Sequence, residues 1–218
     1  MKLFIDSANP KEVKEIADLG ILDGVTTNPS LATKAGIDYK DAVSQILGII
    51  KGDVSLEVLS TDTDSMVEEG QKLAELAKNV VVKLPTTEDG LKALKILNTK
   101  GIKINMTLVF SASQALLVAK IGAYCASPFV GRLDDADESG VEVVKKIRAI
   151  YDNYNFKTQI LFASVRSTQH VEEAALAGAD IATCPYDIMK KLVQHPLTDV
   201  GLKKFLEDFK TSGQKPLV

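Results

Sequence analysis

Lys83 is the residue of this chain best suited to covalent chemistry, because it stands inside an apolar run. It follows three valines and precedes Leu84-Pro85, so its aliphatic stem has apolar neighbours. An ordinary lysine with a pKa near 10.4 is neutral in only about one molecule in a thousand near pH 7, and each unit by which burial lowers that pKa raises the neutral fraction about tenfold. A neutral lysine amine condenses with a ketone to give an iminium ion, which lets a neighbouring carbon–carbon bond break. Lys83 is therefore the predicted nucleophile.

Two carboxylates are placed to move protons around such an amine. Asp6 ends the first apolar run of the chain, and Glu57 lies inside the third. Charged side chains are almost never fully buried unless they are paired, so their presence in apolar runs indicates a function or a pairing. Asp6 and Glu57 are the predicted acid/base pair. The alternative is a purely structural ion-pair network of these carboxylates with Lys83, which would perturb pKa values without doing chemistry.

Polar residues also stand near the ends of the other apolar runs. A single serine or threonine is more often a hydroxyl bonded to nearby backbone than a catalyst, and a lone arginine in a loop is usually solvated. Two arginines that follow neighbouring runs change that balance, because their donors, helped by a serine and a helix N-terminus, suit a phosphate group. The residues concerned are Thr26, Asn28, Asn105, Thr107, Ser127, Arg132, Ser164 and Arg166.

The elements that position these residues alternate regularly along the chain. Short β-branched runs read as strands, at 2–7, 24–27, 55–59, 80–84, 103–109, 123–130, 159–164 and 180–184. Stretches of helical period separate them, at 10–19, 38–51, 64–77, 89–98, 111–120, 141–154, 168–177 and 187–195.

Eight such βα units in 218 residues predict an α/β fold, a closed (β/α)8 TIM barrel made by one domain over 1–218. An open, doubly wound sheet is the alternative, although the chain has no GxGxxG after its first strand and no P-loop. The amphipathic stretch 198–210 exceeds what barrel closure needs. It predicts an additional C-terminal helix, packed across the barrel or against another subunit.

Composition excludes several classes of partner. The net charge of -3 comes from 26 basic and 29 acidic residues that are interspersed, so a nucleic-acid groove is not expected. No apolar run approaches the roughly 20 residues of a membrane span. His170 and His195 are isolated in helical stretches, where we expect them to be solvated or to cap helices, and no spacing suggests a metal site or a cofactor. The start of the chain shows no leader, and Cys125 and Cys184 suit buried, reduced thiols, which predicts a cytoplasmic protein.

Long stretches of the chain resemble the motifs of a known enzyme family, the transaldolases. The sequence GVTTNPSL at 24–31 resembles the first transaldolase motif, and VKLPTTEDG at 82–90 resembles the motif around the active lysine. Shorter matches at 4–6, 105–110, 127–132 and 163–166 extend the likeness over nearly the whole chain. The chain is most similar to the short, single-barrel branch of the family.

The resemblance implies an enzyme that moves a dihydroxyacetone unit from a ketose phosphate (sedoheptulose 7-phosphate or fructose 6-phosphate) to an aldose phosphate (glyceraldehyde 3-phosphate or erythrose 4-phosphate). It implies a Schiff base on Lys83, Asp6 as the acid/base at the hydroxyl beside the scissile bond, and a water held by Glu57 and Thr107 that relays protons. Pentose phosphate metabolism, without a cofactor, is the implied setting. A homo-oligomer such as a decamer, with the C-terminal helix at a contact, is implied as well.

The same resemblance assigns the substrate contacts. Asn28, Asn105 and Ser127 would bond the hydroxyls of the dihydroxyacetone unit, with Thr26 among the candidates beside them. Arg132, Ser164 and Arg166 would hold the phosphate. The chain departs from many relatives at Ser167-Thr168, where they carry a proline, and this puts the rigidity of that loop in doubt.

Two other functions stay open. Some relatives are fructose 6-phosphate aldolases that release free dihydroxyacetone, and these carry Gln at the place of Glu57 and Tyr at the place of Phe129. Here both residues are of the transaldolase kind. The second alternative is a barrel that binds sugar phosphates without turning them over.

Overall fold

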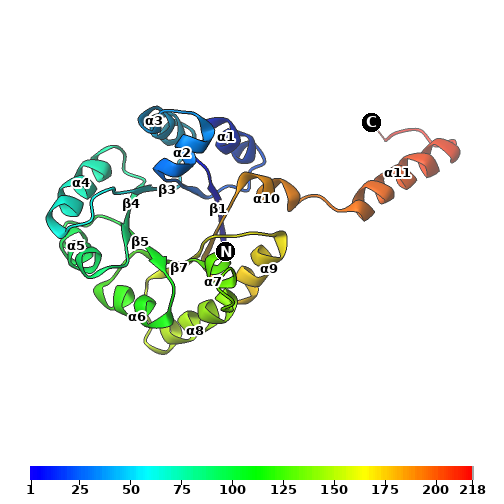
Figure 1. Cartoon of the computed structure of the whole chain (residues 1–218). Helices are drawn as coiled ribbons and strands as arrows, with labels where there is room; N and C mark the ends of the chain where they lie inside the picture. Colours follow the sequence, from blue (N-terminus) through cyan, green and yellow to red (C-terminus); the bar gives the residue numbers. More distant parts are fainter. Residues whose placement is uncertain (218) are drawn as a thin grey trace.

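Eight parallel strands close into a barrel in chain order in the computed structural model, which describes residues 1–217 (Figure 1). The last strand pairs with the first, so the sheet has no open edge. This confirms the predicted (β/α)8 barrel and excludes the open sheet. The strands are β1 (Lys2–Asp6), β2 (Gly24–Thr26), β3 (Asp53–Glu57), β4 (Val80–Pro85), β5 (Ile104–Val109), β6 (Cys125–Pro128), β7 (Gln159–Phe162) and β8 (Ile181–Cys184).

A ring of helices surrounds the strands, with each helix packing its apolar face on the barrel (Figure 1). The eight helices predicted between the strands are all present, and their ends differ from expectation by a few residues at most. They are α1 (Pro10–Asp18), α3 (Tyr39–Ile49), α4 (Thr63–Glu75), α5 (Glu88–Thr99), α6 (Ala112–Ile121), α8 (Gly140–Asn153), α9 (Thr168–Leu176) and α10 (Tyr186–Lys191).

Two further short helices were not expected. α2 (Pro29–Ala35) begins at an Asn28 N-cap followed by Pro29 and ends at Gly36, whose φ of 67° is left-handed. α7 (Val130–Asp134) replaces the end of the predicted sixth strand, 123–130, because β6 stops at Pro128. Arg132, expected in a loop after that strand, therefore lies in a helix.

The inside of the barrel is divided into an apolar end and a polar end. Alternate residues of a strand face the same side, so each inward position repeats after two residues. Near the starts of the strands the interior is filled by a cluster of Phe4, Cys125, Leu161 and Ile181. Two residues further along β1, β6 and β8 stand the polar side chains of Asp6, Ser127 and Thr183. The apolar cluster closes one end of the barrel, and the polar groups gather at the other.

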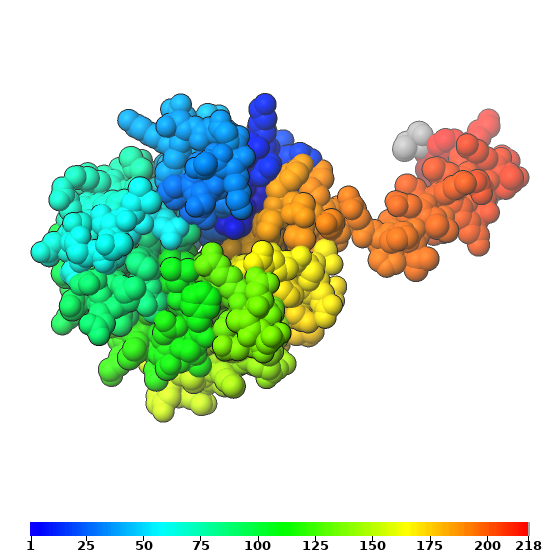
Figure 2. Space-filling model, viewed as in Figure 1, coloured from blue at the N-terminus to red at the C-terminus, as the bar shows by residue number. Residues whose placement is uncertain are grey.

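The C-terminal helix α11 (Pro196–Thr211) stands away from the barrel (Figures 1 and 2). None of its residues is buried, and it begins after His195, whose ring nitrogen Nδ1 accepts a hydrogen bond from the Leu197 backbone N–H. The predicted helix 198–210 and the capping role of His195 are confirmed. Packing across the barrel was the wrong alternative. Among residues 1–217, no helix has the length and apolar character to cross a bilayer.

Candidate active site

Lys83 and Glu57 form an ion pair inside the polar end of the barrel. Their Nζ and Oε2 atoms are 3.1 Å apart, and the side chains are 7% and 26% exposed. The two residues are opposite each other on the neighbouring strands β3 and β4, so the strand register itself brings them together. The lysine is enclosed by the barrel, while the carboxylate keeps access to solvent.

The chain after Lys83 is held by a tight turn. The backbone N–H and the hydroxyl of Thr86 both donate to the carbonyl of Thr107, at 3.0 and 2.7 Å. Thr87 caps α5 by accepting from the Gly90 N–H at 3.0 Å. A Cβ on Gly90 would lie 1.9 Å from the carbonyl oxygen of Pro85, so only glycine fits this turn. These bonds fix the end of the strand that carries the amine.

Asp6 lies at the end of β1 and is supported by two threonines. The Thr26 hydroxyl donates to Asp6 Oδ1 at 2.7 Å and lies 2.6 Å from the Thr183 hydroxyl. Burial raises the pKa of Asp6, against the Thr26 hydrogen bond and the charge of Lys83, which lower it, while the charge of Glu57 adds to the rise. A raised pKa makes the ionised carboxylate a stronger base, which suits a group that accepts and returns a proton.

A second polar chain crosses the barrel from β3 to β6. Ser127 donates to the Asn105 side-chain oxygen at 2.6 Å, and the Asn105 amide donates to Ser55 at 3.3 Å. Thr107, also buried, follows Asn105 on the inward side of β5. Leu108 has a left-handed φ of 59°, at a register shift that turns the end of β5.

The arginines come together with the loop between β7 and α9. α7 docks on this loop through its backbone, since the Val130 N–H donates to the carbonyl of Ala163 at 3.0 Å and the Gly131 N–H to that of Ser164 at 3.2 Å. A Cβ on Gly131 would lie 2.1 Å from the same Ser164 oxygen. Thus Arg132 on α7, and Ser164 with Arg166 on the loop, belong to one packed unit.

The two arginine side chains of this unit already have partners within the protein. The Arg132 guanidinium lies 4.8 Å from the centre of the Phe129 ring. Arg166 is exposed and pairs with Asp135 at 3.0 Å, so a phosphate would compete with that carboxylate. Ser164 has a left-handed φ of 62°, which is unusual for a residue with a side chain.

Asn28 is the predicted site residue whose environment differs most from expectation. Its side-chain oxygen accepts from the Leu31 N–H at 3.0 Å and so caps α2. An open cleft of about 470 Å³ runs beside Asp6 and is lined also by Asn9, Leu31, Lys34 and Tyr186.

Sequence reasoning missed four residues around the site. Ser55 and Thr183 occupy inward strand positions, which the two-residue repeat from Glu57 and Ile181 could have identified. Tyr39 lies at the start of α3, and burial together with the charge of Glu57 raises its pKa to about 12, so its hydroxyl stays protonated. Lys34 on α2 acts on Asp6 through its charge. No sequence signal identified the last two.

The opposite end of the barrel holds a hollow of similar size. It has a volume of about 500 Å³ and lies where β5, β6 and β7 begin, with Lys103, Tyr124 and Lys157 in its lining. Lys103 is paired with Asp53 at 2.9 Å. Active sites of these barrels form where the strands end, so this hollow is not the candidate site.

The two cysteines are buried free thiols, as expected. Burial raises the pKa of Cys184 to about 12 and raises the pKa of Cys125 as well. Neither thiol is a candidate nucleophile.

Comparison with known proteins identifies a family. Residues 3–215 match the family described as Transaldolase/Fructose-6-phosphate aldolase. A probable transaldolase of Parvibaculum lavamentivorans is 54% identical over 218 residues, which is 100% of both chains. That of Hydrogenobaculum sp. is 54% identical over 216 residues, covering 99% of this chain and 100% of the relative. Another from Bartonella bacilliformis is 53% identical over 215 residues, or 99% of both.

A distant solved structure shares the fold alone. A variant of flavocytochrome b2 superposes with a TM-score of 0.60 at 15% identity over 86% of this chain, which spans 57% of that larger chain. The family model and the full-length relatives agree with the motifs around Lys83 and at 24–31. This chain belongs to the transaldolase/fructose-6-phosphate aldolase family.

Proposed function

We propose that this protein is a transaldolase. It takes a dihydroxyacetone unit from a ketose phosphate, sedoheptulose 7-phosphate or fructose 6-phosphate, and gives it to an aldose phosphate, glyceraldehyde 3-phosphate or erythrose 4-phosphate. The observation that carries the proposal is the enclosed Lys83 amine 3.1 Å from Glu57, at the same end of the barrel as Asp6. Pentose phosphate metabolism is the proposed setting.

The reaction begins when the Lys83 amine adds to the ketose carbonyl at C2 and water leaves, which gives an iminium ion. The proton that the ammonium must first lose passes to Glu57, which lies within reach and is partly open to solvent. Thr107 and Glu57 then hold the water that carries protons to and from the adduct. The iminium nitrogen is the electron sink for the next step.

Asp6 is the acid/base for cleavage of the carbon–carbon bond. Its carboxylate removes the proton from the C4 hydroxyl, the C3–C4 bond breaks, the aldose phosphate leaves, and the bond electrons move into the iminium to form an enamine. When a second aldose phosphate enters, the enamine carbon attacks its aldehyde and Asp6 returns the proton. Water then releases the new ketose and frees Lys83.

The remaining residues bind the substrate. Asn28, Asn105 and Ser127 bond the dihydroxyacetone hydroxyls, and Thr26 keeps Asp6 oriented. The donors of Arg132, Ser164 and Arg166 hold the phosphate, and Phe129 supports the Arg132 guanidinium.

The aldolase alternative keeps the same cleavage, but the enamine carbon then takes up a proton instead of attacking a second aldehyde. Water hydrolyses the resulting iminium, which releases free dihydroxyacetone and the Lys83 amine. Glu57 and Phe129 favour transfer, because the resemblance associates Gln and Tyr at these two places with aldolases. The two activities differ in whether the enamine reacts with an acceptor aldehyde or is protonated and hydrolysed.

A substrate-pair assay tests the function and separates the two activities. Fructose 6-phosphate is supplied with and without erythrose 4-phosphate, and both glyceraldehyde 3-phosphate and free dihydroxyacetone are followed. We expect glyceraldehyde 3-phosphate only when the acceptor is present, and none from Lys83→Met. Lys92→Met is the matched control, because Lys92 is exposed on α5 and should keep full activity. Equal rates without the acceptor would establish the aldolase instead.

We also propose that copies of this chain associate through α11 and work in the cytoplasm. The helix exposes Leu202, Phe205, Leu206 and Phe209 at a spacing that puts them on one face. A second copy of the chain is the proposed occupant of that face, and a decamer is the size that the resemblance implies. Light scattering on the purified chain should give a multiple of 23.5 kDa. A monomer at all concentrations would refute the association.

A further inference from the structure

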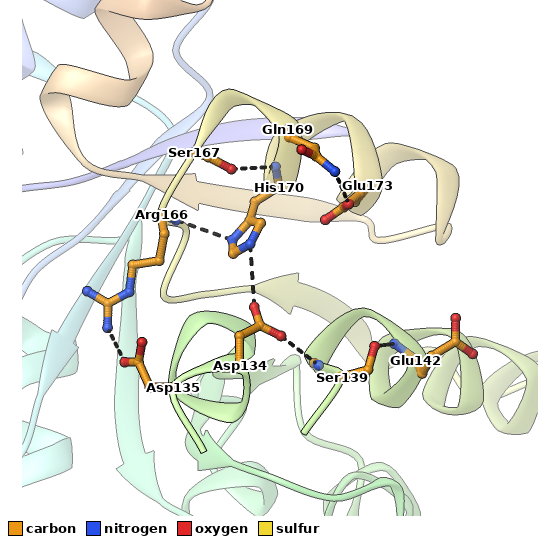
Figure 3. A network of polar contacts seen from close by, with 10 residues as sticks. Asp134, Asp135, Ser139, Glu142, Arg166, Ser167, Gln169, His170 and Glu173 are labelled. Atoms are coloured by element: carbon orange, nitrogen blue, oxygen red, sulfur yellow. Dashed lines mark hydrogen bonds and ion pairs between the residues drawn. The ribbon is translucent and has the colours of Figure 1, made fainter. Parts of the chain in front are cut away.

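His170 was expected to be solvated or to cap a helix, but its ring is bonded on both sides (Figure 3). It projects from the first turn of α9 and is 16% exposed. Its Nδ1 accepts from the Arg166 backbone N–H at 3.3 Å, and its Nε2 lies 3.4 Å from Asp134 Oδ2. The neutral ring with its proton on Nε2 satisfies both contacts, because Nδ1 must accept and Nε2 can then donate to the carboxylate. The ring also packs against that of Phe162, with the ring centroids 6.1 Å apart and the planes at 65°.

Asp134 is itself fixed, so the ring has a rigid support. Its second oxygen, Oδ1, accepts from the Gly140 N–H at 3.0 Å at the start of α8 (Figure 3). Asp134 is the last residue of α7, the same short helix that carries Arg132. The contact from Asp134 through His170 to Arg166 therefore joins α7 and α9 to the loop between β7 and α9.

That loop needs support, because its backbone is in an uncommon conformation. Ser164 has a φ of 62°, which costs energy for a residue with a side chain and persists only where neighbours hold it. The carbonyls of Ala163 and Ser164 are held by N–H groups of α7, and the next backbone group to be held by a side chain is the Arg166 N–H, at His170. The hydrogen bond to His170 therefore holds the backbone of the same residue that carries the Arg166 guanidinium.

We propose that His170, supported by Asp134, is a positioning residue that sets the geometry of the phosphate-binding loop. It does not touch the substrate. Its Nδ1 fixes the Arg166 backbone and so fixes the relative places of Ser164, Arg166 and Arg132. The proposal rests on the proposed function of that loop in holding a phosphate, and not on the chemistry at Lys83.

Three substitutions of His170 test the hydrogen bond at Nδ1 and the contact at Nε2 separately. Asn places an acceptor oxygen close to the position of Nδ1, Gln places a donor close to that of Nε2, and Ala provides neither. We expect His170→Ala and His170→Gln to raise the KM for fructose 6-phosphate about tenfold, the effect of losing one buried hydrogen bond, with kcat changed less than about threefold. His170→Asn should recover most of the parent KM.

The same variants are compared on a substrate that lacks phosphate. With fructose as donor, His170→Ala should differ from the parent by less than about twofold in kcat/KM, because no phosphate is there to be misplaced. His195→Ala is the matched control, since its Nδ1 also accepts a backbone N–H but at α11, and its KM should be unchanged. Equal losses on both donors would show a merely structural role and overturn the proposal.

Binding keeps the test independent of turnover. Calorimetric titration with fructose 6-phosphate, on parent and variants, should reproduce the order of the KM values even if the parent proves inactive. An inactive parent that binds in this order would refute the proposed function alone. Equal affinities for His170→Asn and His170→Gln, or a parent that shows no preference for the phosphorylated sugar, would refute the positioning role. If His170→Ala does not fold, the comparison of Asn with Gln decides.

Discussion

Glu57 and Lys83 are a charged pair in which one partner is enclosed and the other reaches solvent. Glu57→Gln keeps the shape of the carboxylate and removes its charge. We expect a loss in kcat of about 100-fold, the usual contribution of a positioned acid/base. The free energy of unfolding should fall by about 1–2 kcal/mol, less than for a fully buried pair because Glu57 is 26% exposed.

The surface pair of Glu68 with Lys72 provides the control for that experiment. It has a similar contact, 2.6 Å, but both side chains are about 70% exposed. Glu68→Gln should leave both the free energy of unfolding and kcat close to the parent values, because solvent screens an exposed pair. If the two Gln variants have the same kcat and stability, the pair inside the barrel has no special role.

Asp6 gives a pH dependence with a definite sign. Burial raises the pKa of its carboxyl in the folded protein, so the protonated form favours folding. This contribution is complete below the unfolded pKa near 4 and is lost as the pH rises through the raised folded value. Asp6→Asn cannot ionise. The unfolding free energy of this variant relative to the parent should therefore increase as the pH is raised above about 4, even though transfer activity is lost. Urea denaturation across that range measures it, and a difference independent of pH would contradict the burial of Asp6.

The sequence allowed the charged residues to be predicted more readily than their hydroxyl partners. Lys83, Glu57 and Asp6 stand out, because a charge inside an apolar run needs a reason. Ser55 and Thr183 look like ordinary strand residues one at a time. Their partners Asn105 and Thr26 lie on strands that are not adjacent to theirs, so the contacts exist only once the barrel has closed.

At the scale of elements, Gly131 is where α7 meets the loop after β7. An added Cβ would lie 2.1 Å from the Ser164 carbonyl oxygen and 2.8 Å from the Arg166 side chain. Gly131→Ala must push the two elements apart, so we expect a stability loss of about 1–3 kcal/mol and a larger effect on the KM for fructose 6-phosphate than on kcat. Thermal unfolding and initial rates measure the two effects.

Gly48 is the matched control for this prediction. It lies in α3, and no atom stands within 4 Å of its added Cβ. Gly48→Ala should stabilise the protein by about 0.5–1 kcal/mol through helix propensity, without a change in KM. A KM that is unchanged in Gly131→Ala would contradict the proposed coupling of α7 to phosphate binding by the loop after β7.

The two unexpected helices show what local sequence can and cannot predict. α2 carries its signals with it, since Asn28, Pro29 and Gly36 occupy the positions that cap and start a helix. α7 has no side-chain cap, and its first N–H groups donate to carbonyls of a loop more than thirty residues later. Its conformation therefore depends on tertiary contact, which no local pattern at 123–130 reports.

At the scale of the whole molecule, the barrel leaves unexplained the exposed apolar stripe of α11, which is formed by Leu202, Phe205, Leu206 and Phe209. Phe205 lies at the centre of this stripe and is 71% exposed. Phe205→Glu should lower the mass found by sedimentation velocity, because a charge would be buried in the contact between copies. Lys203→Gln changes the net charge by the same amount off the stripe and should sediment like the parent. Identical sedimentation of both variants and parent would place the contact elsewhere.

The barrel could be predicted from alternation along the chain, whereas the placement of α11 could not. Each strand and its following helix form a local unit, and repetition of that unit leaves few ways to bury the apolar faces. The stretch 198–210 predicts an amphipathic helix equally well whether its apolar face meets the barrel or another chain. Residues 192–196 lead the chain outward after α10, and this direction places α11 away from the barrel (Figure 1).

The central claim is that the Lys83 amine forms a covalent bond with the ketose. Borohydride reduction of the protein in the presence of fructose 6-phosphate, followed by peptide mass spectrometry, tests it most directly. A three-carbon dihydroxyacetone unit should be found on Lys83, with Lys92→Met labelled like the parent and Lys83→Met unlabelled. A folded protein that takes up no label, or takes it up on another lysine, would contradict the account.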